Sequence, residues 1–181
     1  MAQRYEFDIA VIGGGPAGYV AAIRASQLGA KTALIEKSHL GGVCTNLGCI
    51  PTKALIHAAR AMLQAQSARP LGLEAEGLRL DFSRTARHRD QVVARLRNGV
   101  ESLLKANKVE LRRGEASFAD DHTLLVKTEG RQGRLSAARI LIATGAVPTE
   151  LPDAPFDRER IIDSSAAVSL EELPQSLLIV G

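Results

Sequence analysis

The sequence predicts an α/β fold, with a parallel sheet, crossover helices and a small β-meander. Two apolar runs, over residues 7–12 and 31–36, flank a helical segment that opens with a glycine cluster. Short alternating segments follow between residues 109 and 143. Of the 181 residues, 45% are hydrophobic and 24% are charged, which excludes disordered and collagen-like classes.

Composition and charge argue against two kinds of partner. Aromatic residues make up only 3% of the chain and the net charge is +3, so neither a platform of stacked rings nor a strongly basic surface for nucleic acid is expected. The longest uncharged runs, 9–23 and 38–52, are shorter than the roughly 18 apolar residues of a membrane span. The charged N-terminus is not laid out like a signal peptide. We therefore expect a cytoplasmic protein with no membrane and no nucleic-acid partner.

The chain begins with a βαβ unit. Residues 7–12 predict a buried strand, and residues 16–28 predict a helix with proline in its first turn and Gly29 just after its end. Residues 31–36 predict a second strand. A unit of about 30 residues is the expected crossover of a parallel sheet.

The middle of the chain is expected to be mainly helical. A polar, glycine-rich loop over 37–48 leads to a helix over 52–66, and a second loop, over 67–82, leads to a long helix over 83–107. The apolar residues of the long helix recur at spacings of three and four, which is the period of one helical face.

The C-terminal part is expected to contain short strands and an irregular connection. The strands are predicted over 109–112, 116–118, 123–128 and 140–143, with Gly130 and Gly133 at a turn. Residues 147–163 indicate a connection. The final run, 176–181, ends like residues 9–13 and indicates the first strand of a second dinucleotide-binding unit, cut at its first glycine.

The glycine cluster is a G-x-G-x-x-G motif in which each glycine has a reason. Gly13 allows the tight turn, Gly15 lets the backbone approach a pyrophosphate, and Gly18 lets the helix pack against the sheet. The helix N-terminus offers N–H groups and the positive end of its dipole to phosphates. Glu36, at the end of the next strand, can accept hydrogen bonds from a ribose hydroxyl. The motif indicates a dinucleotide site without separating FAD from NAD, and the simpler alternative is a glycine turn with a surface glutamate.

A second motif contains the two cysteines of the chain, Cys44 and Cys49. A disulfide between them would close a short loop, which in the chain-entropy model contributes about 2 kcal/mol, against roughly 4.7 kcal/mol for a hundred-residue loop. Such a bridge stabilises little, so we interpret the pair as a redox switch. Cys49 comes just before a helix whose dipole favours a thiolate. Lys53, four residues later, can lie on the same face and favour the thiolate further.

Two other interpretations of the cysteines stay open at this point. They could be inert buried thiols, although the flanking glycines and the proline and lysine that follow would then have no role. They could also join His39 and His57 in a metal site, although C-x4-C is not the usual C-x2-C spacing.

Residues 44–53 resemble the redox-active disulfide signature of the flavin-dependent disulfide reductases that use a pyridine nucleotide. The glycine-rich first strand, the cysteine segment, the Ala-Thr-Gly sequence of residues 143–145 and the final apolar run come in that family's order. Within the family, residues 48–53, the Ala-Leu-Ile-His-Ala-Ala stretch that follows and residues 89–93 are most similar to the dihydrolipoyl dehydrogenases. The resemblance covers essentially the whole chain.

The resemblance implies a Rossmann-like FAD-binding domain over residues 1–150, with its redox disulfide segment at 41–53. Residues 151–181 would be the connection and the first strand of an NAD-binding domain that is cut off. In this family a C-terminal His–Glu pair supplies the base for the substrate dithiol, and the four histidines here do not match it. We therefore expect these 181 residues alone to be inactive.

The resemblance also implies roles for individual residues. Cys44 would be the interchange thiol and Cys49 the charge-transfer thiolate against the flavin, with Lys53 near the flavin N5. Thr52 stands where serine is more usual and keeps the hydroxyl. The residues expected to bind the cofactor are Gly13, Gly15, Gly18, Glu36, Gly42, Lys53, Ala116, Thr144 and Gly145.

The implied reaction is oxidation of dihydrolipoamide through the Cys44–Cys49 disulfide and FAD, with NAD as the final acceptor and no metal. Implied partners are a lipoyl domain, a second copy of the chain, and an acyltransferase subunit that could dock on the basic residues 84–113. The simpler interpretation of that segment is a solvated helix face. The alternative functions are a sister reductase acting on glutathione disulfide, on mercuric ion or between nicotinamides, and a non-catalytic flavin-binding module.

Overall fold

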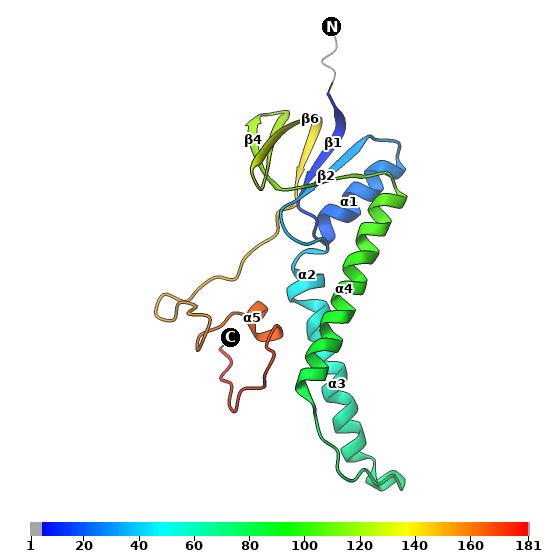
Figure 1. The fold of residues 1–181 in the computed structure, drawn as a ribbon, viewed down its shortest axis with the longest axis vertical. Helices are drawn as coiled ribbons and strands as arrows, with labels where there is room; N and C mark the ends of the chain where they lie inside the picture. Colours follow the sequence, from blue (N-terminus) through cyan, green and yellow to red (C-terminus); the bar gives the residue numbers. More distant parts are fainter. Residues whose placement is uncertain (1–4, 181) are drawn as a thin grey trace. The chain divides into compact units, whose positions relative to one another are not determined.

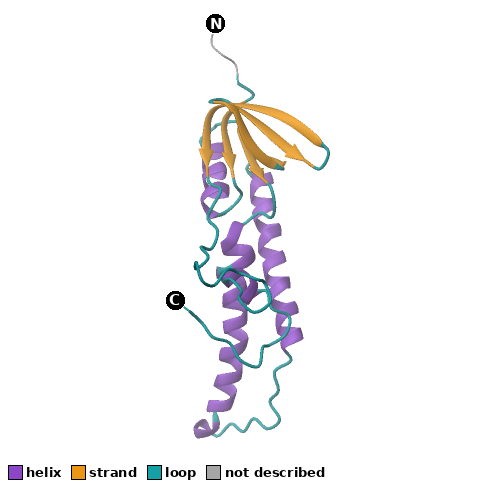
Figure 2. Ribbon diagram, turned by 90° about the vertical axis from the view of Figure 1, so that its left-hand side faces the viewer, coloured by secondary structure: helices purple, strands orange, loops and turns teal. Residues whose placement is uncertain are grey.

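The computed structural model describes residues 5–180 (Figure 1, Figure 2). The chain divides into two compact units, of which the first comprises residues 1–46 and 95–147 and the second comprises residues 47–94 and 148–181. The long helix α4 (Phe82–Ala106) passes from the second unit into the first. None of the helices in the described part of the chain is long and apolar enough to cross a membrane.

The first unit is built on one six-stranded sheet, which Figure 2 shows in orange. Its strands are β1 (Phe7–Ile12), β2 (Thr32–Glu36), β3 (Glu110–Arg113), β4 (Glu115–Asp120), β5 (Thr123–Thr128) and β6 (Arg131–Ile142), in the spatial order β3-β2-β1-β6-β5-β4. Neighbours from β3 to β6 are parallel, and neighbours from β6 to β4 are antiparallel. The predicted class, a parallel sheet with crossover helices and a small β-meander, is confirmed.

Strand β6 joins the two parts of this sheet. Its residues 131–136 pair with β5, and its residues 137–142 pair with β1. The prediction of a strand over only 140–143, with Gly133 in a turn, is wrong, because Gly133 pairs with Val126 inside β6. The first half of β6 is polar and mostly exposed, so it lacks the apolar alternation by which a strand is recognised in a sequence.

Aliphatic residues fill both faces of the sheet. The cluster on the meander side consists of Phe7, Ala10, Ile12, Ala33, Ile35, Leu124, Val126, Leu135 and Ala137. The cluster on the helix side consists of Val11, Ala22, Leu34, Leu40, Val100, Leu104 and Val109. Val11 and Ile12 fall into different clusters because successive strand side chains point to opposite faces. Burial on both faces, roughly 1.5–3 kcal/mol for each large aliphatic side chain, fixes the carboxyl ends of β1 and β2.

The longer helices lie close to their predicted positions: α1 (Pro16–Gln27), α3 (Cys49–Ser67) and α4. Two differences concern the cysteine segment. Residues 37–48, predicted as a loop, contain the helix α2 (Gly42–Leu47), which is too short to show a helical period. Helix α3 begins at Cys49 rather than at residue 52, because Pro51 is tolerated in a first helical turn.

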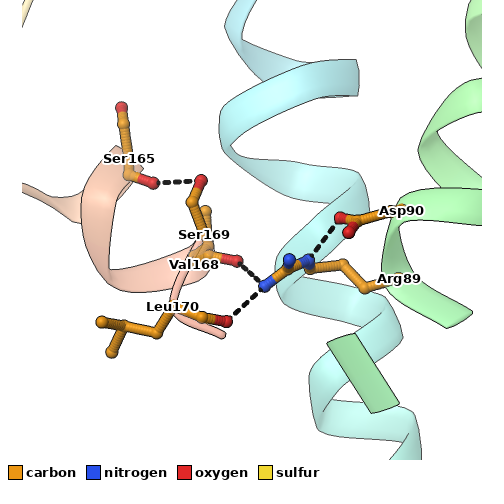
Figure 3. A network of polar contacts seen from close by, with 6 residues as sticks. All are labelled: Arg89, Asp90, Ser165, Val168, Ser169 and Leu170. Atoms are coloured by element: carbon orange, nitrogen blue, oxygen red, sulfur yellow. Dashed lines mark hydrogen bonds and ion pairs between the residues drawn. The ribbon is translucent and has the colours of Figure 1, made fainter. Parts of the chain in front are cut away.

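The second unit contains α3, the first part of α4, the 3₁₀ helix η1 (Arg69–Leu71) and α5 (Ser164–Val168). Arg89 of α4 is only 4% exposed. Its Nη1 donates to the carbonyl oxygens of Val168 and Leu170 at 2.9 and 2.8 Å, and its Nε donates to Asp90 Oδ1 at 2.8 Å (Figure 3). One buried guanidinium thus satisfies two carbonyl groups at the end of α5.

The strand predicted over residues 176–181 is not formed in the described part, 176–180, and Gly181 lies outside it. Leu178 and Val180 are 88% and 74% exposed. A strand needs a neighbour for its N–H and C=O groups, and no strand among residues 5–180 pairs with this run. The assignment of residues 151–181 to a further domain stays a prediction.

Candidate functional site

The turn after β1 contains the glycine motif. Gly13 has a φ of +105°, and its N–H donates to the Ile35 carbonyl oxygen at 2.8 Å. A Cβ added at Gly13 would overlap the Ala143 carbonyl oxygen, and one added at Gly18 would overlap the Gly13 carbonyl oxygen. The turn therefore requires glycine at both positions, because a side chain would overlap backbone atoms of the chain itself. At Gly13 the positive φ is a second reason.

Gly15 is different, because no atom among residues 5–180 approaches closely enough to require glycine there. An added Cβ would meet only the Gly42 Cα, at the ordinary contact distance of 3.7 Å. Gly15 is also the N-cap of α1, which has no side-chain cap and no acidic residue in its first turn. Its first-turn N–H groups thus have no side-chain acceptor within residues 5–180, which leaves them available to an anion.

Glu36 closes β2 and holds the glycine turn. Its Oε2 accepts a hydrogen bond from the Gly14 N–H at 2.6 Å, and its Oε1 accepts one from the Ser38 N–H at 2.7 Å. Each carboxylate oxygen keeps a further lone pair for a ligand hydroxyl. The sequence indicated only the ribose role, because the bond to Gly14 depends on how the two strands lie side by side.

A pocket of about 140 Å³ lies at the carboxyl ends of β1 and β2. It is lined by Ile12, Gly13, Ile35, Glu36, Lys37, Gly114, Glu115, Ala116 and Thr144. Ligands of open parallel sheets bind in the crevice at this edge. The pocket brings together four residues that the sequence analysis assigned to the cofactor, although they lie far apart in the chain.

Other lining residues of the pocket were not anticipated. Lys37 Nζ forms an ion pair with Glu115 Oε1 at 3.2 Å, and both side chains are about two-thirds exposed. The Gly114 N–H donates to the Glu36 carbonyl oxygen at 2.9 Å. Gly145, which was anticipated, has a φ of +81° and is exposed, and it does not line the pocket.

The helix that carries Cys44 begins against the glycine turn. The Gly41 N–H donates to the Gly14 carbonyl oxygen at 2.8 Å. Gly42, the first residue of α2, has a φ of +58°, and a Cβ added to it would lie 2.7 Å from the Gly15 Cα. Cys44 is half-buried, two residues further along α2. Gly42 therefore packs on Gly15 of the glycine turn, and its closeness to the cofactor stays a prediction.

Cys49 and Lys53 belong to the second unit, whose boundary falls between Asn46 and Leu47. Cys49 is exposed and is the first residue of α3, which has no side-chain cap and no acidic residue in its first turn. Lys53 is exposed and lies one helical turn further along. The structure contains Cys44 and Cys49 without a disulfide.

The alternative interpretation of the cysteine segment, a metal site shared with His39 and His57, finds no set of ligands among residues 5–180. His39 and His57 are both exposed. In the part of the chain that the structure describes, no group of three or more His, Cys, Asp or Glu residues could hold a metal ion.

Three features of the site belong together: a glycine turn that enters an uncapped helix, an acid at the end of the next parallel strand, and a thiol-bearing helix packed on that turn. They are typical of a dinucleotide-binding α/β protein with thiol chemistry. The chain matches the pyridine nucleotide-disulphide oxidoreductase family over residues 7–181, and it belongs to that family. Membership implies FAD as cofactor and oxidoreductase chemistry for the family as a whole.

Named relatives narrow the similarity. The chain is 47% identical to a dihydrolipoyl dehydrogenase from Staphylococcus aureus and 46% identical to one from Geobacillus stearothermophilus, each over 97% of this chain and 37% of the relative. The chain therefore spans little more than a third of the length of the curated relatives it matches.

Solved structures agree with this fold. LpdA from Mycobacterium tuberculosis matches 92% of this chain and 38% of its own, with a TM-score of 0.83 and 26% identity. The HOCl-induced flavoprotein disulfide reductase RclA from Escherichia coli, solved as a Cu(II) complex, matches 94% of this chain and 36% of its own, with a TM-score of 0.77 and 31% identity.

Proposed function

We propose that this chain is the FAD-binding and dithiol-bearing part of a dihydrolipoyl dehydrogenase. The observation that carries the proposal is the contact between Gly42, which opens the cysteine helix α2, and Gly15 of the glycine turn. A thiol therefore lies on an element that begins at the nucleotide site. The similarity to dihydrolipoyl dehydrogenases supports this choice within the family.

The residues present fit FAD. Because Gly15 has no side chain, a pyrophosphate can approach its backbone closely, and the N–H groups of the first turn of α1 would hold that pyrophosphate. Glu36 would hold the ribose, with Ala116 and Thr144 beside it in the pocket. When bound, FAD supplies a two-electron acceptor between the dithiol and NAD.

Cys44 and Cys49 would exchange a disulfide with the substrate. A thiolate of dihydrolipoamide attacks Cys44 Sγ, so a bond forms between substrate and Cys44 while the bond to Cys49 breaks and Cys49 leaves as a thiolate. The second substrate thiol loses its proton and attacks the substrate sulfur of this mixed disulfide, which releases Cys44. The substrate is then a cyclic disulfide, and the two cysteines hold the electron pair. The position of Cys49 at the start of α3 favours its departure as a thiolate.

NAD as final acceptor, a homodimer, a cytoplasmic location and a lipoyl domain as substrate carrier are also proposed, and similarity to the same relatives supports them. The basic segment, residues 84–113, gives little support to an acyltransferase partner. Five of its nine cations are bonded within the chain, namely Arg84, Arg89, Arg97, Arg112 and Arg113. Arg89 is buried and Arg112 and Arg113 lie in β3, so these five cations do not form one continuous surface for a partner.

A sister disulfide reductase is the second candidate. The 31% identity to a flavoprotein disulfide reductase favours it. The two candidates share the glycine turn and the cysteines, so they differ in which disulfide oxidises the reduced pair fastest.

The exchange step can be tested on the 181-residue chain without flavin. The two cysteines are reduced, and their oxidation by lipoamide and by glutathione disulfide is followed by mass spectrometry. We expect lipoamide to be faster, and we expect a mixed disulfide to accumulate on Cys44 in the Cys49→Ser variant. Adducts that form only on Cys49 would reverse the roles, and a preference for glutathione disulfide would favour the sister reductase.

Two further measurements test the cofactor and the missing base. We expect the chain alone to bind FAD only weakly. Adding the chain should quench FAD fluorescence, an excess of NAD should not reverse that quenching, and Glu36→Ala should reduce it. With dihydrolipoamide and NAD, the chain alone should show no turnover, because general base action is worth roughly a hundred- to ten-thousand-fold in rate. Turnover like that of a full-length relative would show that the base lies within these 181 residues.

A further inference from the structure

The side chain of Asn46, near the end of α2, makes four hydrogen bonds. Its Nδ2 donates to the carbonyl oxygens of Leu40 and Gly42, at 2.9 and 2.8 Å. Its Oδ1 accepts from Arg97 of α4, from Nε at 3.0 Å and from Nη2 at 2.8 Å. A carboxamide has two N–H donors and two acceptor positions, so the hydrogen-bonding capacity of this side chain is fully used.

These bonds connect the two ends of α2. Gly42 is the first residue of the helix, and Asn46 is the last but one. A helix this short is not stable by itself, because its nucleation cost exceeds what so few bonds return. The bond to Leu40, which is buried in the helix-side core, extends the connection to the sheet. Since the Gly41 N–H holds the start of α2 to Gly14, Cys44 lies on a helix that is held at both ends.

Arg97 fixes the orientation of the Asn46 amide. Its planar guanidinium directs two N–H groups at one oxygen, which leaves the amide nitrogen facing the two backbone carbonyls. Arg97 and Asn46 are both partly buried, so water competes only in part for these bonds. Without Arg97, the amide could rotate and release the Leu40 and Gly42 carbonyls.

We propose that Asn46 and Arg97 are positioning residues that hold Cys44 at the nucleotide site for thiol–disulfide exchange. The inference rests on the proposed function, because the orientation of α2 matters to the reaction only if Cys44 is the reacting thiol. The pair acts through the helix and not on the reacting sulfur.

Single-cysteine chains test this without flavin or turnover. Cys49→Ser leaves Cys44, Cys44→Ser leaves Cys49, and each is alkylated with N-ethylmaleimide with and without Arg97→Met. We expect Arg97→Met to raise the rate at Cys44 about three- to ten-fold, as for the net loss of one ordinary hydrogen bond, and to change the rate at Cys49 by less than about two-fold.

Three variants sharpen the result. Arg97→Lys keeps the charge and can donate to the amide, so its effect should be smaller than that of Arg97→Met. Asn46→Asp keeps an acceptor oxygen for Arg97, but its second carboxylate oxygen faces the Leu40 and Gly42 carbonyl oxygens and repels them. The alkylation rate at Cys44 should therefore rise at least as much as in Arg97→Met. Arg95→Met is the matched control, because Arg95 is exposed on the same helix and its side chain makes no hydrogen bond or ion pair within residues 5–180.

The comparison of the two cysteines decides the outcome. Equal acceleration at both thiols would indicate general loosening and overturn the proposal, as would unchanged rates in a variant whose circular dichroism shows intact helices. Selective acceleration at Cys44 supports the positioning role whichever disulfide is the substrate. Failure of the proposed function would show separately, as absence of exchange with lipoamide in the chain with native Arg97.

Discussion

The two units of the chain are stabilised in different ways. In the first unit, aliphatic side chains are buried on both faces of the sheet. In the second unit, the buried residues among those described are Pro51, Ala86, Arg89 and Val93. The first unit therefore fixes the nucleotide site by packing, whereas the second depends on a few polar contacts. Substitutions in the two units should therefore lower the free energy of unfolding for different physical reasons.

The largest effect is expected from Gly18→Ala in the first unit. The added Cβ would overlap the Gly13 carbonyl oxygen, which is a backbone atom, and the position of a Cβ is itself fixed by the backbone, so neither atom can move aside. Helix α1 must then separate from the sheet, which we expect to cost at least 3 to 5 kcal/mol, about the upper range for single substitutions. Urea unfolding followed by circular dichroism measures the loss.

Gly99→Ala is the matched control for that substitution. Gly99 lies inside α4, and an added Cβ would meet no atom within 4 Å. Alanine is the better helix former, so this variant should be more stable by roughly 0.5 to 1 kcal/mol. Equal stabilities for the two variants would show that the packing of α1 on the turn is not what requires glycine.

In the second unit, Arg89→Met should have the next largest effect. It leaves the carbonyl oxygens of Val168 and Leu170 without their donor (Figure 3). Loss of hydrogen bonds to a buried charged group costs about 2 to 3 kcal/mol. Faster hydrogen exchange over residues 164–170, with little change in β1 and β2, would show that the damage is local. Arg87→Met, two residues away and exposed, should leave this exchange unchanged, and a uniform increase over both units would contradict the assignment.

A third substitution separates the fold of the first unit from its ligand. Gly15→Ala should change the free energy of unfolding by no more than about 1 kcal/mol, the disadvantage of alanine at an N-cap, because the added Cβ meets only an ordinary contact. FAD binding should weaken about ten-fold or more, which corresponds to 1.4 kcal/mol, because the methyl group stands where the pyrophosphate would approach. Fluorescence titration with FAD beside urea unfolding gives both numbers. Unchanged FAD affinity would mean that the ligand does not approach this turn.

The comparison also explains what could be predicted from the sequence. The glycine turn was predictable because Gly13 has a local reason, its positive φ in the turn, and Gly18 has another, the carbonyl group of Gly13; the close approach of Ala143 to Gly13 was not. The sheet was predictable because β1 and β2 contain short apolar runs, residues 9–12 and 33–35, that are largely buried on both faces. Helix α2 was not, since it owes its stability to side-chain bonds with Arg97, 51 positions further along the chain.

The site shows the same limit. Glu36 was found from its place after a strand, but its bond to the Gly14 N–H follows from the parallel pairing of β1 and β2. Gly114 and Glu115 line the pocket only because β3 pairs with β2. No local pattern at these positions signals a ligand, so spacing along the chain could not have indicated them.

The smallest expected effect concerns acid and the second unit. The Asp157 Oδ1 accepts backbone N–H bonds from Ile161, Glu159 and Arg160, each at 2.8 Å. These bonds, of which the bond from Ile161 is the strongest contributor, lower the pKa of the Asp157 carboxyl below its ordinary value.

A lowered pKa in the folded state means that the contribution to stability is complete above the ordinary value of about 3.9 and is lost as the pH falls through the folded value. Acid should therefore loosen residues 157–161. In the first unit, the pKa of Asp120 is lowered in the same way, chiefly by the His122 N–H, so acid should also act on residues 120–123, and the buried strands β1 and β2 serve as the reference. Carbon-detected NMR titration should give a midpoint for Asp157 below 3.9, and Asp157→Asn should remove the pH dependence of amide exchange at residues 159–161. A midpoint at the ordinary value would show that these three bonds do not hold the carboxylate in solution.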